Sequence, residues 1–127
     1  MEYIHTDLLP KAIGPYSQAI THNGLLYSSN QIPLTADGEM VERDLKVQAR
    51  QVLENIKNLV ESLECSMNDV IKVTIYIQDM KDFPIINVIF AEAFGDHKPA
   101  RSTVEVSGLP MDSMVAMDFI AQVSTYH

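Results

Sequence analysis

The chain lacks several features that would assign it to a specialised class of protein. Its 127 residues include a single cysteine, Cys65, so an internal disulfide is impossible and a reducing, cytoplasmic compartment is expected. No apolar run approaches the roughly 18 residues of a membrane helix. The N-terminal segment MEYIHTDLL lacks the basic and apolar regions of a signal peptide. Basic residues are also few, 9 against 17 acidic ones, and a net charge of -8 argues against nucleic-acid binding.

The common motifs of metal, phosphate and nucleophile sites are absent as well. The sequence contains no glycine-rich phosphate loop, no nucleophile elbow and no zinc-binding spacing of cysteine and histidine. We therefore expect no metal site. The histidines have no metal-like spacing, and we interpret all four as solvent or loop residues: His5, His22, His97 and His127.

The composition is that of an ordinary globular protein, with 46% hydrophobic and 20% charged residues. This length suffices for one core, so residues 1–127 are expected to form a single domain. Hydrophobic periodicity, together with glycine and proline breaks, indicates where the elements lie. Strands are expected over residues 3–6, 17–21, 25–29, 70–77, 101–106 and 114–124, and helices over 44–63 and 83–94.

Local signals support this order of elements. Asn23-Gly24 predicts a tight hairpin between the second and third strands, and Asp82 is expected to cap the second helix. Both helices need the same sheet, so the order β-β-β-α-β-α-β-β predicts an α+β fold with two helices on one face of a mixed sheet. The other face mixes apolar and polar residues, which is typical of contact with another subunit. In the strand over residues 70–77, the predicted buried face is Ile71, Val73, Ile75 and Ile77.

The stretch Lys98–Val106, with Pro99 at its entry, is the strongest candidate for a binding site. Side chains alternate along a strand, so Arg101, Thr103 and Glu105 share one face. A guanidinium held by a half-buried strand can grip a planar carboxylate with two parallel hydrogen bonds. The same pattern also fits an arginine that pairs with a structural carboxylate at a sheet edge, and the residues alone leave both interpretations open.

Five parts of the chain resemble the Rid (reactive intermediate deaminase, YjgF-type) family. They are Ile13–Ala19, Ser28–Leu34, Val73–Ile77, Asn87 and Pro99–Val106, in order and at the expected spacings. The resemblance implies a chorismate-mutase-like α+β fold and a homotrimer with ligand clefts between subunits. It further implies hydrolysis of 2-imino acids, such as 2-iminobutanoate and 2-iminopropanoate, to 2-keto acids and ammonia without a cofactor.

The resemblance also implies roles for individual residues. Arg101 would clamp the substrate carboxylate. The hydroxyl of Ser29 and the main chain at Thr103 would line the pocket. Tyr16 and Asn87 would close it from the neighbouring subunit.

The chain departs from the family pattern at three places. Thr103 stands where many members have a reactive cysteine, and Asn30 replaces the glycine of a Ser-Gly-Gln segment. Ala116 occupies the position of a glutamate that positions the attacking water. Asp118 lies two residues further on the same face, so we include it among the candidate catalytic residues.

These departures leave three functional hypotheses open. The first is an imine deaminase that acts with Arg101, Tyr16 and Asp118. The second is a non-catalytic trimer that binds small carboxylates or a protein partner, which Ala116 favours. The third is a ribonuclease, against which the acidic charge and the lack of paired His or Lys acid-base groups count.

Overall fold

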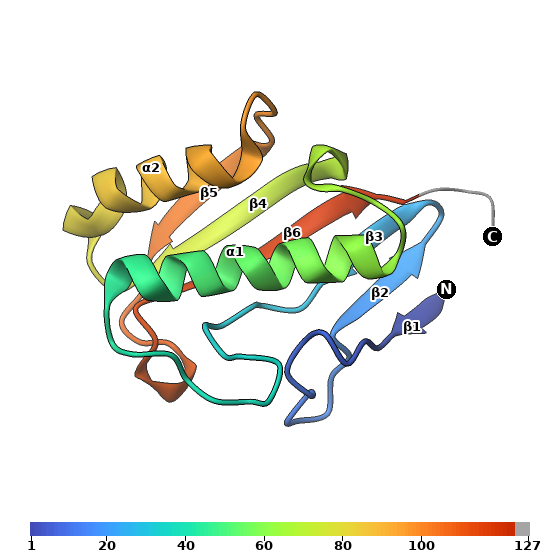
Figure 1. Cartoon of the computed structure of the whole chain (residues 1–127), viewed down its shortest axis with the longest axis horizontal. Coiled ribbons are helices and arrows are strands. Elements are labelled where there is room, and N and C mark those ends of the chain that lie inside the picture. Colours follow the sequence, from blue (N-terminus) through green and yellow to red (C-terminus); the bar gives the residue numbers. More distant parts are fainter. Residues whose placement is uncertain (124–127) are drawn as a thin grey trace.

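Six strands form one mixed sheet, and two helices cover one of its faces (Figure 1). This computed structural model describes residues 1–123, so Ser124, the predicted end of the last strand, and His127 lie outside it. The strand order across the sheet is β1-β2-β3-β6-β4-β5, with only the β4–β5 pair parallel. The predicted fold class and element order are confirmed. The elements are β1 Glu2–Ile4, β2 Ala19–His22, β3 Leu25–Ser28, α1 Leu45–Ser62, β4 Val70–Ile77, α2 Phe83–Phe94, β5 Ala100–Glu105 and β6 Val115–Gln122.

Helix α1 begins where its sequence predicts. The Asp44 side chain accepts a hydrogen bond from the backbone N–H of Val47 at 3.0 Å, which satisfies one of the free amides of the first turn. One stripe of the helix is buried against the sheet at 3.6-residue spacing. Its apolar members are Leu45, Ala49, Val52, Leu53, Ile56, Leu59 and Val60.

Helix α2 begins differently from the prediction. Asp82 is its N-terminal flanking residue, but the Asp82 side chain makes no capping hydrogen bond. Its backbone is already in the helical region, whereas a capping residue is usually extended. Pro84 lies in the first turn, where its missing N–H costs nothing. The helix ends at Gly95, as predicted, with φ of 62°.

Strand β4 has the predicted bounds, but the predicted burial of Ile71 is wrong. Ile71 is 44% exposed, whereas Val70 is buried. The register with β6 shifts between Val70 and Lys72, and the extra residue turns Ile71 out of the core. From Val73 to Ile77 the alternation follows the prediction.

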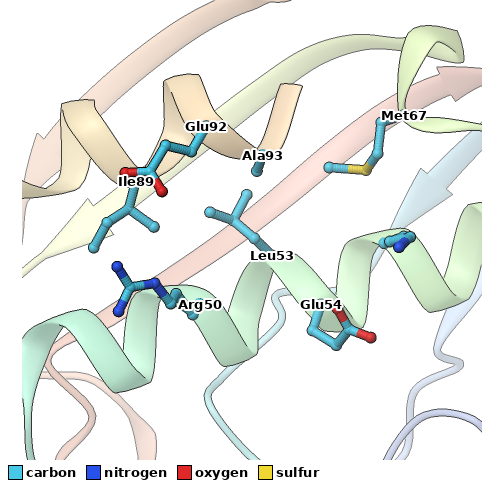
Figure 2. Close-up of a pocket in the computed structure, with 8 residues that line it drawn as sticks. Arg50, Leu53, Glu54, Met67, Ile89, Glu92 and Ala93 are labelled. Atoms are coloured by element: carbon cyan, nitrogen blue, oxygen red, sulfur yellow. The ribbon is translucent and has the colours of Figure 1, made fainter. Parts of the chain in front are cut away.

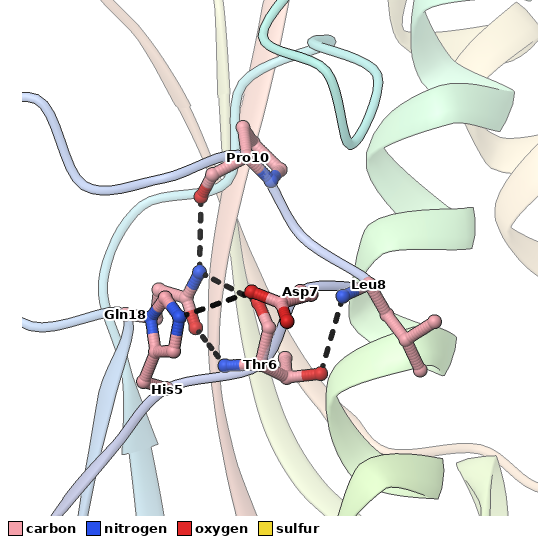
Figure 3. Close-up of polar contacts among 6 residues, drawn as sticks. All are labelled: His5, Thr6, Asp7, Leu8, Pro10 and Gln18. Carbon is pink, nitrogen blue, oxygen red and sulfur yellow. Dashed lines mark hydrogen bonds and ion pairs between the residues drawn. The ribbon is translucent and has the colours of Figure 1, made fainter.

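The N-terminal strands are shorter than predicted because polar side chains bond the intervening loop. β1 ends at Ile4, and β2 begins at Ala19 after the buried Gln18. The Gln18 amide accepts from the Thr6 N–H at 2.7 Å and donates to the carbonyls of Thr6 and Pro10 at 3.1 and 3.0 Å (Figure 3). These bonds fix the loop that leads to Tyr16.

Strand β6 lies between β3 and β4 and supplies the centre of the core. Its inward face matches the prediction, with five buried side chains that pack beneath α1. The predicted Asn23-Gly24 hairpin is also confirmed, since both residues have positive φ and His22 pairs with Leu25. The five side chains are Val115, Met117, Phe119, Ala121 and Val123.

Candidate functional site

Arg101 lies on the edge strand β5 and points toward the helices. It pairs in register with Val73, whose side chain belongs to the core, so both occupy the helix-covered face. The Arg101 guanidinium carbon lies 5.3 Å from the ring centroid of Phe83 and 5.0 Å from that of Phe90. Two aromatic faces at this distance attract the cation and hold its fork in place.

Arg101 has no carboxylate partner within residues 1–123. The ion pairs in this part of the chain are His5 with Asp7 and Arg43 with Asp112. The interpretation of Arg101 as half of a structural ion pair is therefore not supported. A half-buried cation without a counter-ion has a partly lost hydration shell and donors available for an anion.

The guanidinium lines a cavity of about 400 Å³ between α2 and the start of β5. Asn87 faces the same cavity, so the structure groups Asn87 with Arg101 of its own chain. His97 and Lys98 also line it, and sequence reasoning gave neither a role, although Lys98 begins the candidate stretch. Their only signal was closeness to Arg101 along the chain. The complete lining is Asn87, Phe90, Ala91, Phe94, Gly95, His97, Lys98, Pro99 and Arg101.

His97 has a fixed orientation in this cavity. Its Nε2 lies 2.7 Å from the carbonyl oxygen of Val70, which can only accept, so Nε2 carries the proton of this bond. The His97 ring also contacts that of Phe94, with centroids 6.1 Å apart. His97 lies in a loop, as predicted, but its ring is half-buried and bonded to Val70.

A second group of predicted residues lies at the far end of the β2–β3 hairpin. Tyr16, Ser29 and Asn30 line a smaller cavity of about 40 Å³. The Ser29 hydroxyl donates to the Ser17 carbonyl at 2.5 Å, and the Ser29 N–H donates to the Gln18 carbonyl at 2.9 Å. Tyr16 is 52% exposed, so its ring is available to a ligand or a partner chain.

Asp118 lies next to this second group. Tyr27 pairs with Ile120 and Gln31 pairs with Met117, so residues 28–30 stand opposite residues 118–119. Three residues of this segment therefore face two residues of β6. The one additional residue interrupts the ladder of backbone hydrogen bonds and places Ser29 and Asn30 beside Asp118.

Asp118 is itself bound by Tyr76. The Tyr76 hydroxyl donates to the Asp118 carboxylate at 2.9 Å. This hydrogen bond, followed by burial and by the Asp118 charge, raises the pKa of Tyr76 above its usual value. Ala116 stands directly opposite Tyr76 and is fully buried. One oxygen of the carboxylate is thus engaged by a phenol.

The two groups of candidate residues lie far apart within one chain. Val73 pairs with both Arg101 and Phe119, and the Phe119 N–H donates to the Ser28 hydroxyl. Arg101 and Ser28 are therefore separated by three strand spacings, about 14 Å. Asp118 also occupies the face opposite to Arg101, because it pairs with Thr74 and not with a core residue. One small ligand cannot contact both groups of the same chain.

Thr103 shares the face of Arg101, and its hydroxyl oxygen is buried without a hydrogen-bond partner. A buried hydroxyl without a partner costs about 1–3 kcal/mol. We expect Thr103→Val to raise the free energy of unfolding by about 1 kcal/mol in urea denaturation. Thr74→Val, at a half-buried position on the other face, is the control and should gain less. A loss of stability in Thr103→Val would show that the hydroxyl has a partner.

A groove of about 390 Å³ between α1 and α2 carries none of the predicted site residues (Figure 2). Its floor is apolar, and its rim has charges of both signs, including Arg50 and Glu92.

Within residues 1–123 there is no cluster of three or more His, Cys, Asp or Glu suited to a metal ion. In the same range neither helix has the length and apolar character required to cross a membrane.

Comparisons with known proteins agree with this fold and with the order of its motifs. The family model described as Endoribonuclease L-PSP matches residues 6–123. A RutC family protein of Pyrococcus horikoshii is 52% identical over 121 residues, which cover 94% of this chain and 96% of the relative. The mitochondrial protein MMF1 of Saccharomyces cerevisiae is 39% identical over 118 residues, which cover 93% of this chain and 81% of the relative.

Solved structures give the same assignment. A conserved Rid protein family member from Yersinia pestis is 44% identical, with a TM-score of 0.93 over 96% of this chain and 98% of that one. Escherichia coli TdcF, solved with bound serine, is 38% identical, with a TM-score of 0.91 over 98% of this chain and 100% of that one. The family match, the identities and the shared architecture together place this chain in the Endoribonuclease L-PSP family, which includes the Rid and YjgF proteins.

Proposed function

We propose that this protein hydrolyses reactive 2-imino acids, such as 2-iminopropanoate and 2-iminobutanoate, to 2-keto acids and ammonia. The observation that carries the proposal is the half-buried Arg101, which lines a cavity and has no carboxylate partner within residues 1–123. A guanidinium in this state binds a carboxylate through two charge-assisted hydrogen bonds. The serine bound to TdcF is an amino acid of similar size, which agrees with a small carboxylate as ligand.

The chemistry requires little beyond this clamp. Water adds to the electrophilic carbon of the C=N bond, and the resulting carbinolamine expels ammonia and leaves the 2-keto acid. The protein contributes by holding the carboxylate and by orienting the water. Arg101 and Asn87 supply the binding half, while Tyr16, Ser29 and the Tyr76–Asp118 pair supply polar groups for the water.

Two copies of the chain must then meet to complete one site. The two halves are separated by about 14 Å in a single chain, so we propose clefts between the subunits of a homotrimer. The uncovered face of the sheet suits such an interface because aligned apolar residues cross it, including the exposed Tyr3 and Tyr27. This row is Tyr3, Ile20, Tyr27 and Ile120, in register on β1, β2, β3 and β6.

A second candidate function is binding of small carboxylates without turnover. Ala116 favours it, because the position lacks a carboxylate and the Asp118 carboxylate two residues further on is bound by Tyr76.

A ribonuclease activity has one supporting observation, the joint presence of His97, Lys98 and Arg101 in one cavity. Against it stands the net charge of -8, which repels a polyanion. A cytoplasmic location also remains a proposal, since one relative is mitochondrial.

The decisive experiment is the hydrolysis of freshly generated 2-aminoacrylate and 2-iminobutanoate by the wild-type protein. We expect release of 2-keto acid and ammonia well above the rate in buffer, by about 10²-fold or more if proton transfer is catalysed. Pyruvate binding with no acceleration would instead support the non-catalytic alternative. Cleavage of a single-stranded RNA oligonucleotide at a comparable rate would support the ribonuclease.

A further inference from the structure

The cavity beside Arg101 has a charge that is unusual for this chain. Two of its lining residues, Arg101 and Lys98, are cationic. Among residues 1–123, no acidic residue lines it, although the chain has 17 acidic residues against 9 Lys and Arg. Within residues 1–123, neither Arg101 nor Lys98 belongs to an ion pair. The cavity is therefore a local positive region on an acidic protein.

The cationic groups are arranged along the cavity. Three residues of chain span at most about 10 Å, which limits the separation of the Lys98 and Arg101 backbones. Phe90 and Phe94 form an apolar wall, with ring centroids 4.7 Å apart. Phe90 also stacks on the guanidinium, while Phe94 contacts His97. An apolar wall thus extends from the Arg101 cation to the His97–Lys98 end.

A ligand with one carboxylate can pair with Arg101 or with Lys98, but not with both. The 2-imino acids of alanine or aminobutyrate are also small relative to a cavity of about 400 Å³. A ligand with a second carboxylate at the end of a short aliphatic chain would place one anion on Arg101 and the other near Lys98. Its methylene groups would lie against Phe90 and Phe94.

We propose that the preferred substrates are dicarboxylic 2-imino acids of the glutamate type, which yield 2-oxo dicarboxylic acids. The inference rests on the proposed function and specifies its substrate class. The reaction is unchanged: water adds to the C=N carbon, ammonia leaves, and the distal carboxylate takes no part in bond making or breaking. Lys98 contacts this distal group and so determines specificity.

The test compares two open-chain ligands of matched shape by isothermal titration calorimetry: 2-oxoglutarate and 5-methyl-2-oxohexanoate, in which an isopropyl group replaces the distal carboxylate. In the wild type we expect the diacid to bind at least about tenfold more tightly, the value of one additional charge-assisted hydrogen bond. Lys98→Gln should reduce this ratio to about threefold or less, and Lys98→Arg should restore it. Lys72→Gln is the matched control, because Lys72 donates to the Ser102 hydroxyl on the other face of the sheet.

The outcomes separate this inference from the proposed function. Equal affinity of the wild type for the diacid and the monocarboxylate would overturn the dicarboxylate preference, while the deaminase proposal stands. No binding of either 2-oxo acid, with no imine hydrolysis, would overturn both. Displacement of 2-oxoglutarate by inorganic phosphate at equal concentration would show that the cavity selects dianions in general, and the assignment to dicarboxylic acids would be wrong.

Discussion

Arg101→Ala is expected to lower the affinity for 2-keto acids and the kcat/KM for imine hydrolysis by about 30-fold or more. The substitution removes both donors of a bidentate, charge-assisted contact, worth about 2–5 kcal/mol when the partner charge is left without a counter-ion. Arg101→Lys keeps the charge but loses the fork and the stacking on two phenyl rings, so it should recover only part of the activity. Binding is measured by calorimetry and turnover by release of 2-keto acid.

Arg43→Ala provides the matched control for this prediction. Arg43 is an exposed arginine that pairs with Asp112, away from the cavity. Its removal should leave binding and turnover within about twofold, since exposed ion pairs contribute less than about 1 kcal/mol. Far-ultraviolet circular dichroism should be unchanged in all three variants. Undiminished 2-keto acid binding by folded Arg101→Ala would move the site elsewhere.

Mixing two inactive variants is expected to restore activity, because each proposed cleft takes its halves from different chains of the proposed trimer. One variant is Arg101→Ala, and the other combines Tyr16→Ala with Ser29→Ala. Each homotrimer lacks one half of every cleft. After the two are unfolded and refolded together at equal concentration, roughly a quarter of the clefts combine two intact halves in a symmetric ring. Activity should therefore return to about a quarter of the wild-type value per chain.

Two controls make the mixing experiment decisive. Variants that are refolded separately and then combined should stay inactive for as long as subunits do not exchange. Light scattering should give about three times the 14.2 kDa mass of the chain for the wild type and the mixture. A monomer of full activity, or a mixture that remains inactive although each variant assembles, would contradict a cleft built from two chains.

The sequence predicts this fold well wherever a local pattern decides the structure. The bounds of β4 and the start of α1 near Asp44 follow from neighbouring residues alone, and so does the Asn23-Gly24 turn. The predicted burial of Ile71 was wrong because the orientation of this side chain depends on a bulge against β6, a strand more than 40 residues away. Periodicity within one strand carries no information on such an irregularity.

The candidate site, too, was predictable only where neighbouring residues along the chain determine the structure. Strand alternation correctly placed Arg101 and Thr103 on one face. The stacking on Phe83 and Phe90 and the bond from Tyr76 to Asp118 were not predictable, since they depend on helix packing and on strand register. The separation of the candidate residues into two groups emerges only when the strand order is known, because no spacing along the chain shows which strands are neighbours.

The position of β6 has a consequence for how the chain folds. The β2–β3 hairpin and the β4-α2-β5 unit are each local in sequence, but they join only through β6, which follows both. Until β6 has been synthesised, β3 and β4 each present an unpaired edge that another chain can extend. Insertion of this strand between two waiting edges is a late, non-local event, so we infer that it limits the folding rate. A nascent chain stalled before Val115 is the form most prone to aggregation.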